Sequence, residues 1–230
     1  MELWWRFLIL IIGGYLIGNI FTARIISKIR KTDISKQGSG NPGTMNMLRT
    51  GGLPLALVNL FFDLMRGLIP ALGGYYLLGG PGSEYGLIGL YTGGLAALIG
   101  NLFPVFYKFK GGKGASVVYG ICWVVNWQLA LIVMGAGIIY LLIFDYGAVV
   151  SLSLVTAFTV VQGIAAQGNI AISLLLIAIF CLMWWGFRQN VVRLLTGKES
   201  KVNFRASIAK LRSKRHMKKE EKLRRSNELG

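Results

Sequence analysis

Long apolar runs separated by short polar segments dominate this sequence. Six clear runs are each near the roughly 20 residues that a helix needs to cross the hydrocarbon core of a bilayer. Because 54% of the 230 residues are hydrophobic and only 15% are charged, the chain belongs to the membrane class of proteins. The runs cover about residues 4–28, 53–79, 85–107, 128–144, 147–165 and 169–187.

A further, shorter apolar segment at residues 115–125 leaves two layouts open. A short helix there, followed by a turn around Asn126, gives two shallow spans between Gly114 and Tyr146. A single long tilted helix over the same residues gives one span. The two layouts differ in the parity of the spans, so they place the last polar segment on opposite sides of the membrane.

The distribution of basic residues decides between the layouts, because Lys and Arg accumulate in short cytoplasmic loops. Basic clusters follow the first run, the third run and the last run, whereas the intervening loops near 80–85, 126 and 166–169 carry none. Seven spans with the N-terminus outside put all three clusters on the cytoplasmic side, and six would separate them. We therefore predict an all-α integral membrane protein with about seven transmembrane helices and a cytoplasmic C-terminus.

The end of the chain differs in composition from the rest. Of the 25 Lys and Arg residues, 14 lie from Arg188 onward, although the net charge of the whole chain is +16. We predict a transmembrane domain at residues 1–202 and a basic cytoplasmic tail at 203–230. The tail is expected either to lie on anionic lipid of the inner leaflet or to remain a solvated charged segment. Its charge would also suit nucleic acid, but no nucleic-acid-binding motif accompanies it.

The three basic clusters coincide with three polar stretches, so the predicted topology gives the protein one polar, cytoplasmic face. The first stretch is GSGNPGTMNMLRTGG at residues 38–52. Its glycines allow close approach of backbone N–H donors, and Arg49 adds a forked cation, which together favour a phosphate cradle. A flexible loop between helices is the competing interpretation.

The second stretch is KFKGGKG at residues 108–114, and the third is NVVRLLTGKESK at 190–201. The second is not a nucleotide-binding P-loop, because the first glycine of that motif is absent and Ala115 replaces its hydroxyl residue. In the third, Asn190 and Arg193 share a helical face and Gly197 can end the helix.

Few other residues offer chemistry. The single histidine, His216, falls in the tail, and both cysteines lie inside apolar runs, so the sequence predicts no metal site and no histidine-based triad. Asp63 and Arg66 lie three residues apart inside the second run, where ionisable groups are costly, and we expect them to pair.

Taken together, the segments GSGNPGTMNMLRT, NLFPVFYKFKGGKG and NVVRLLTGKESK resemble, in order and spacing, the signature segments of the integral-membrane bacterial glycerol-3-phosphate acyltransferases that use acyl phosphate as donor. FFDLMRG at residues 61–67 is similar to that family's second span. The resemblance implies transfer of a fatty acyl group to the sn-1 hydroxyl of glycerol 3-phosphate, giving lysophosphatidic acid and phosphate, without a cofactor.

The same resemblance implies which residues form the site. For catalysis it indicates Ser39, Arg49, Lys113 and Asn190. For substrate binding it indicates Gly40, Asn41, Gly43, Asn46, Lys108, Gly111, Gly112, Ser151, Arg193 and Glu199.

The sequence departs from the family pattern at several positions. Met45, Asn101 and Leu154 stand where the family usually has threonine, histidine and serine. Phe187 stands where histidine is usual, and Lys198 where threonine is common. These changes leave two alternatives open: a family member with an altered acceptor, or one that binds lipid or a partner without chemistry. An anion transporter is a third interpretation, which the confinement of the glycine loops to one face disfavours.

The residues present also constrain the mechanism. With no histidine in the apolar body, we expect no covalent acyl-enzyme. Acyl phosphate is already an activated anhydride, so positioning and fixed cations can suffice. A phosphate monoester has its second pKa near 6, so the acceptor's own phosphate dianion can take the proton of the attacking hydroxyl.

Overall fold

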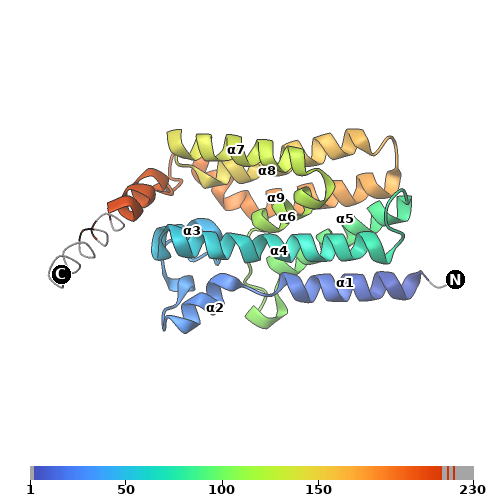
Figure 1. Cartoon of the computed structure of the whole chain (residues 1–230), viewed down its shortest axis with the longest axis horizontal. Helices are drawn as coiled ribbons and strands as arrows, with labels where there is room; N and C mark the ends of the chain where they lie inside the picture. The colour runs from blue at the N-terminus through green and yellow to red at the C-terminus, as the bar shows by residue number, and fades with distance from the viewer. Residues whose placement is uncertain (1–2, 214–216, 218–219, 221–230) are drawn as a thin grey trace, which may run out of the picture.

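The structure is a computed structural model that describes residues 3–213, 217 and 220, and over these residues the chain is an all-helical bundle (Figure 1). The helices are α1 Trp4–Gly18, α2 Thr22–Ile29, α3 Thr44–Gly51, α4 Leu53–Leu77, α5 Glu84–Leu102, α6 Ala115–Val125, α7 Trp127–Ile143, α8 Gly147–Ala165 and α9 Ile170–Leu195. Single 3-10 turns lie at Ile34–Lys36 and Val105–Tyr107. Residues 204–213 are also helical and project away from the bundle (Figure 1).

Within the described residues, five helical segments are long and apolar enough to cross a membrane, and α6 and α7 are shorter apolar helices. This confirms the prediction of an all-helical integral membrane protein. The two-helix interpretation of residues 115–144 is also confirmed, since α6 and α7 are separate. Asn126 separates them, and its side-chain oxygen accepts a hydrogen bond from the Leu129 N–H (2.9 Å), which caps α7.

Two boundaries differ from the prediction. The first apolar run is interrupted after Gly18, so α1 and α2 are separate helices, and the Gly18 carbonyl accepts a hydrogen bond from the Arg66 side chain (3.1 Å). The second half of the glycine-rich stretch, Thr44–Gly51, is helix α3 and not loop. The end of the last helix agrees with the prediction: α9 continues past the apolar run to Leu195, and Gly197 follows it with φ +68°.

Small residues allow the helices to approach closely, as is usual in membrane bundles. A Cβ on Gly67 of α4 would lie 1.9 Å from the Val117 carbonyl of α6, and one on Gly120 of α6 would lie 2.1 Å from the Leu64 carbonyl of α4. The short helix α6 is therefore fixed against the middle of α4.

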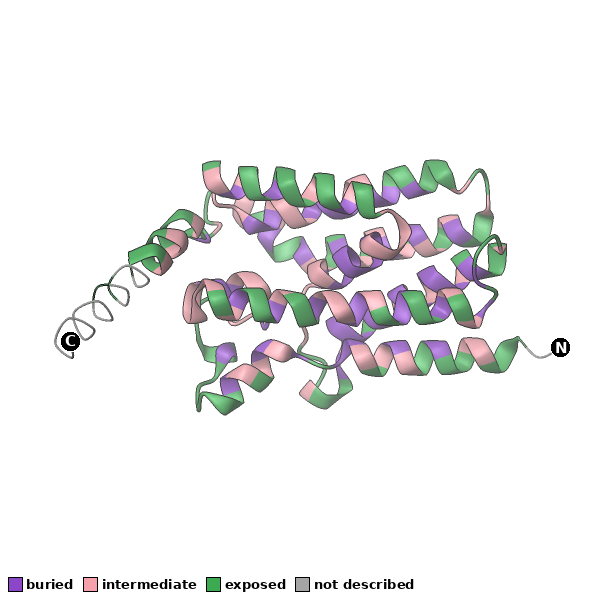
Figure 2. Cartoon of the chain, viewed as in Figure 1, coloured by how far each residue is buried: buried purple, intermediate pink, exposed green. Residues whose placement is uncertain are grey.

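The outward faces of the bundle are apolar as well as exposed (Figure 2). Ile12, Phe61 and Ile132 are each more than half exposed, which fits a hydrocarbon solvent. The described part of the chain's N-terminus and its C-terminal helix lie at opposite ends of the bundle (Figure 1). The three polar stretches lie toward the end from which the C-terminal helix projects.

Candidate functional site

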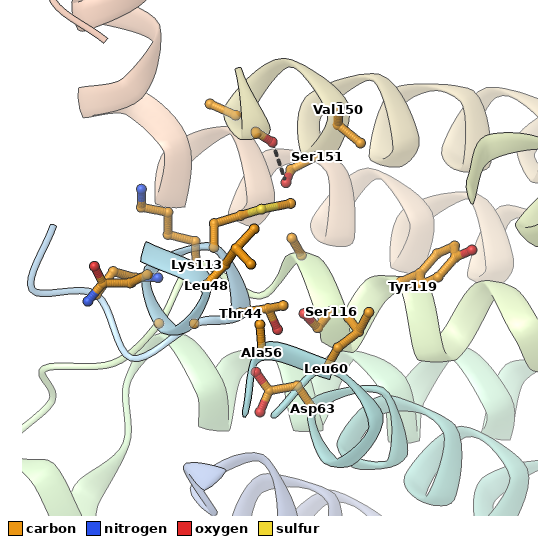
Figure 3. Close-up of a pocket in the computed structure, with 18 of the residues that line it drawn as sticks. Thr44, Leu48, Ala56, Leu60, Asp63, Lys113, Ser116, Tyr119, Val150 and Ser151 are labelled. Carbon is orange, nitrogen blue, oxygen red and sulfur yellow. Dashed lines mark hydrogen bonds between the residues drawn. The ribbon is translucent and has the colours of Figure 1, made fainter. Parts of the chain in front are cut away.

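A cavity of about 370 Å³ opens among α3, α4, α6, α7, α8 and the end of α9 (Figure 3). Polar side chains from all three predicted stretches line one end of it, including Ser39, Lys113 and Asn190. Aliphatic side chains of α4, α7 and α8 line the rest. The cavity therefore has the two-part character of an amphiphile, with a charged end and an apolar slot.

Lys113 reaches the cavity from the loop that joins α5 to α6. Next to it, the Gly112 N–H donates to the Asn101 carbonyl (2.9 Å), which ties this loop to the end of α5. A Cβ on Gly111 would lie only 2.1 Å from the same carbonyl, and Gly114 has φ +86°. The glycines of KFKGGKG are thus needed to fold the loop tightly enough to present Lys113.

A continuous chain of hydrogen bonds connects Lys113 to the third stretch. The Lys113 ammonium donates to the Asn190 side-chain oxygen (2.5 Å). The Asn190 amide group in turn donates to Glu199 (2.8 Å), whose other carboxylate oxygen pairs with Arg193 Nε (2.9 Å). Asn190 is 4% exposed, so its two hydrogen bonds fix both Lys113 and Glu199 in a nearly dry environment.

Burial, together with the neighbouring charge of Arg193, lowers the pKa of Lys113 to about 8, while Glu199 opposes the shift. Burial also lowers the pKa of the Arg49 guanidinium. Both shifts have the same cause: burial disfavours positive charge at these two side chains, so an anion that supplies compensating negative charge would be bound favourably.

The first stretch is organised by Asn46 of α3, which is 1% exposed. Its side-chain oxygen accepts from the Ser39 N–H (2.8 Å), and its amide group donates to the Gln37 carbonyl (3.0 Å). Gly38 and Gly40 have φ values of +56° and +70°, and a Cβ on Gly38 would lie 2.2 Å from the Asn46 oxygen. The side chain of Asn46 therefore shapes the loop that carries Ser39.

Arg49 of α3 faces the cavity and also holds the segment that follows α9. We call residues 198–204 the strap. The Arg49 guanidinium donates to the carbonyls of Ser200 (2.9 Å) and Lys201 (3.1 Å). Through this contact, α3 is joined to a segment about 150 residues further along the chain.

Ser151 lies on the α8 wall, where its hydroxyl donates to the Gly147 carbonyl of its own helix (3.0 Å; Figure 3). On the opposite wall, Asp63 pairs with Arg66 (2.6 Å), which confirms the pairing predicted from the sequence. Asn59 donates to both Asp63 (2.8 Å) and the Thr44 hydroxyl (3.1 Å), and thereby links this buried ion pair to the cavity surface.

The structure brings most of the sequence-predicted site residues together. Around the cavity lie Ser39, Asn41, Gly43, Asn46, Arg49, Gly112, Lys113, Ser151, Asn190, Arg193 and Glu199. Gly40, Lys108 and Gly111 are not among its lining residues. Gly40 and Gly111 shape the loops that carry lining residues, and Lys108 ends the 3-10 turn after α5 in a left-handed conformation with φ +52°.

Sequence reasoning missed Thr44, Ser116 and Tyr119 as lining residues. The spacing of Ser116 and Tyr119, three apart on one face of α6, was the available signal. The positions that depart from the family pattern, Met45, Asn101, Leu154 and Phe187, also line the cavity. Within residues 3–213, 217 and 220, no cluster of His, Cys, Asp and Glu could hold a metal ion.

Comparisons with known proteins agree with this geometry. The sequence model of the glycerol-3-phosphate acyltransferase family matches residues 8–197. A glycerol-3-phosphate acyltransferase of Coxiella burnetii is 37% identical over 197 residues, which cover 85% of this chain and 98% of that protein. One of Idiomarina loihiensis is 33% identical over 193 residues, which cover 84% of this chain and 94% of the relative.

Two solved structures are also similar to the chain. Both are crystal structures of PlsY (YgiH), an integral membrane glycerol 3-phosphate acyltransferase, one in the glycerol 3-phosphate form and one in the lysophosphatidic acid form. Each is 31% identical in sequence and covers 85% of this chain and 94% of its own. The TM-scores are 0.76 and 0.74.

Proposed function

From the premise that the chain belongs to the glycerol-3-phosphate acyltransferase family, we propose how its site performs that reaction. The protein is an integral-membrane enzyme of phospholipid synthesis that forms lysophosphatidic acid. The donor is acyl phosphate, and the acyl group goes to the sn-1 hydroxyl of glycerol 3-phosphate.

One observation carries this assignment: the Lys113–Asn190–Glu199 chain stands at the mouth of an apolar slot. Acyl phosphate has the same two parts, a phosphate and a hydrocarbon chain. Lys113 and Arg49 attract the phosphate groups of donor and acceptor, while the hydroxyl of Ser39, which lines the cavity, supplies a further donor. Asn190 orients the ammonium of Lys113.

The bond changes are those of a direct acyl transfer. The sn-1 oxygen attacks the acyl carbonyl carbon, the bond from that carbon to the phosphate oxygen breaks, and inorganic phosphate leaves. The sn-1 proton passes to a phosphate dianion, because the sequence has no histidine before residue 216 to accept it. Asp63 also lines the cavity, but its carboxylate is engaged by Arg66 and Asn59.

The acyl chain occupies the slot between α4 on one side and α7 and α8 on the other. From Leu141 to Val133 the lining face of α7 spans about 12 Å at 1.5 Å per residue. An extended hydrocarbon advances roughly 1.3 Å per carbon, given bonds near 1.5 Å, so the slot accepts roughly nine carbons. Lys113 and Tyr119 stand at opposite ends of the site (Figure 3), and Tyr119 closes the inner end by donating to the Ala130 carbonyl (2.8 Å).

Longer chains leave the slot sideways. Leu57 of α4 and Met134 and Ile138 of α7 line the cavity, yet each is more than one third exposed. These side chains form an opening toward the bilayer, so the remaining carbons of a long acyl group stay in lipid. The protein thus holds the first half of a long acyl chain, and the second half lies in lipid.

The proposed membrane topology is consistent with the location of the phosphate end of the cavity. We propose seven membrane-crossing helices, with the N-terminus outside and the C-terminus in the cytoplasm. The phosphate end of the cavity then faces the cytoplasm, where glycerol 3-phosphate is soluble. The protein is a multi-pass protein of the bacterial cytoplasmic (inner) membrane; the bacterial source of its relatives and the similarity to an integral membrane enzyme support this placement.

Residues 1–202 act as the transmembrane catalytic domain and 203–230 as a basic tail. Much of the tail lies outside the described residues, but 204–213 form a helix with Arg205, Lys210 and Arg212 exposed. This helix is suited to anionic lipid headgroups at the cytoplasmic surface, where each basic residue contributes about 1 kcal/mol. No role in nucleic-acid binding is proposed.

A second candidate, an altered acceptor, is favoured by one observation. Met45, Leu154 and Phe187 replace polar residues of the family and line the cavity. They make its walls less able to hydrogen-bond a small polyol than the family pattern would. A protein that binds lipid without chemistry would share these features but would form no product.

The direct test is to incubate the purified protein in lipid nanodiscs with palmitoyl phosphate and glycerol 3-phosphate and to measure lysophosphatidate. Lys113→Met is the comparison, because it keeps an unbranched side chain only one atom shorter and removes the charge. Product from the parent and little from the variant is the expected result. A folded parent that consumes palmitoyl phosphate only with another polyol would establish the altered acceptor. If the folded parent consumed palmitoyl phosphate when no acceptor was present, that result would refute acyl transfer.

A further inference from the structure

The strap, residues 198–204, is held at a second point beyond its contact with Arg49. In the turn between α7 and α8, the backbone carbonyl of Asp145 accepts a hydrogen bond from the Val202 N–H (2.9 Å). The Asp145 carboxylate accepts another from the Phe204 N–H (2.8 Å). Arg49 of α3 and Asp145 therefore hold the strap from opposite sides of the cavity.

Between these two points the strap is also packed. Val202 is 1% exposed and belongs to a buried cluster that includes Leu48 of α3 and Leu141 of α7. Gly147 makes room for it, since a Cβ there would lie 3.3 Å from Val202 and 3.0 Å from Met45. The strap thus fills the space between α3 and the α7–α8 turn at the polar end of the cavity.

The position of the strap determines the position of the phosphate-binding groups. Glu199 belongs to the strap and accepts the hydrogen bond that fixes the Asn190 amide. Asn190 accepts the hydrogen bond from Lys113. If the strap moved outward, Glu199 would leave with it, Asn190 would lose one of its partners, and the ammonium would no longer be held.

The backbone of Asp145 has an unfavourable conformation, and its two hydrogen bonds to the strap offset this cost. Its φ is +65°, in the left-handed region that is unfavourable for residues other than glycine, although Asp and Asn tolerate it best. Asp145 is not among the residues that line the cavity. Asp145 therefore does not contact the site directly, and any influence on phosphate binding would pass through its hydrogen bonds to the strap.

We propose that Asp145 is a positioning residue for phosphate binding: its carboxylate clamps the strap at Phe204, and the clamped strap holds Glu199 in place. Glu199 in turn fixes Asn190, and Asn190 fixes the ammonium of Lys113. This inference rests on the proposed function, because it assigns the clamp to the phosphate site of the acyltransferase.

The turn conformation allows a clean set of variants. Asp145→Gly removes the carboxylate and tolerates positive φ, so it deletes the hydrogen bond without adding backbone strain. Asp145→Asn keeps the oxygen acceptor and also tolerates positive φ. Gln167→Gly is the matched control, since Gln167 has φ +47° in the α8–α9 turn, at the opposite end of α8 from Asp145.

Asp145→Gly is expected to raise the KM for glycerol 3-phosphate about tenfold, the scale of losing one hydrogen bond to a charged acceptor, with kcat changed less than about twofold. Asp145→Asn should restore most of the affinity, and Gln167→Gly should behave as the parent. A fall in kcat with unchanged KM, or no rescue by Asn, would overturn the proposal.

Cleavage by trypsin after Lys198 or Lys201 reports strap opening independently of catalysis. In the parent, glycerol 3-phosphate and inorganic phosphate should each slow this cleavage, because binding and strap closure are linked. Asp145→Gly should be cleaved faster without ligand. Cleavage at the parent rate in Asp145→Gly would overturn the clamp whatever the activity. Phosphate protection in a parent that forms no lysophosphatidate would support the clamp while refuting the proposed function.

Discussion

Replacing Lys113 with methionine should reduce kcat/KM for glycerol 3-phosphate between roughly 30-fold and 1000-fold. A hydrogen bond to a charged group contributes about 1.5–3 kcal/mol. Two unit charges 4 Å apart interact by about 4 kcal/mol at an effective dielectric constant near 20. Lys113 is largely buried and already oriented by Asn190, so a loss of about 2–4 kcal/mol is expected, and each 1.36 kcal/mol is tenfold in rate.

The pH dependence gives this prediction a second signature. Burial lowers the pKa of Lys113 to about 8, so the free enzyme loses the ammonium as the pH rises through 8. Since kcat/KM reports the free enzyme and free substrate, it should fall about tenfold per pH unit above 8. On the acid side it should fall below about pH 6, where the acceptor's phosphate dianion is protonated.

The same lowered pKa fixes the sign of a stability effect. The folded protein binds fewer protons at Lys113 than the unfolded chain does between pH 8 and the ordinary lysine pKa of 10.5. Without ligand, this residue therefore destabilises the fold below pH 8, and the penalty disappears as the pH rises through that window. Bound phosphate should offset the penalty below pH 8.

The variant Lys113→Arg keeps the positive charge but changes the group that carries it. A guanidinium stays protonated over the whole assayed pH range, so the alkaline fall near pH 8 should vanish in this variant even if its maximal rate is lower. The assay is initial-rate formation of lysophosphatidate in nanodiscs from pH 5.5 to 9.5 at subsaturating acceptor. An unchanged alkaline fall in Lys113→Arg would show that another group titrates, and a loss below about threefold in Lys113→Met would refute the role of the charge.

Three further predictions concern the loop, the ion pair and the slot. Gly111→Ala should abolish most activity, because the added Cβ would lie 2.1 Å from the Asn101 carbonyl; Gly73→Ala, with nothing within 4 Å, should keep parental activity in the same assay. Asp63→Leu should destabilise the protein by about 3–5 kcal/mol, since it leaves the buried Arg66 without its ion-pair partner. Thermal unfolding in detergent measures this loss of stability. If the added change Arg66→Leu failed to recover stability, the result would count against this prediction. Tyr119→Ala should let more of the acyl chain enter, so photo-crosslinking from carbon 12 of an alkyl phosphate should shift from lipid to the α6–α7 region, whereas Tyr119→Phe should label as the parent does.

The positions at which this chain departs from its family also gain a meaning from the structure. Met45, Asn101, Leu154 and Phe187 are far apart in the sequence, yet all line one cavity. Phe187 places its ring 5.2 Å from the Lys113 nitrogen, so an aromatic face and a cation remain in contact where the family usually has histidine. The four departures therefore come from four helices, α3, α5, α8 and α9, and meet around a single cavity.

Apolar runs and the placement of basic residues were sufficient to predict a helical membrane protein with its polar stretches at one end, because burial in lipid depends on composition and length alone. The spacing of Asp63 and Arg66 likewise predicted their ion pair, since three residues on a helix bring side chains together. Most of the site residues that the family segments indicated do line the cavity.

Other features depend on contacts that only folding creates. The Gly18 carbonyl at the break between α1 and α2 is bound by Arg66 of another helix. The strap is held by Arg49 and Asp145, which are about 96 residues apart and contact it at residues 200–204. The slot depends on α6 ending at the right depth against α4 and on Tyr119 reaching Ala130. Hydrophobic pattern determines which segments are helices, but the partners of buried polar groups are fixed only when helices distant in sequence pack together.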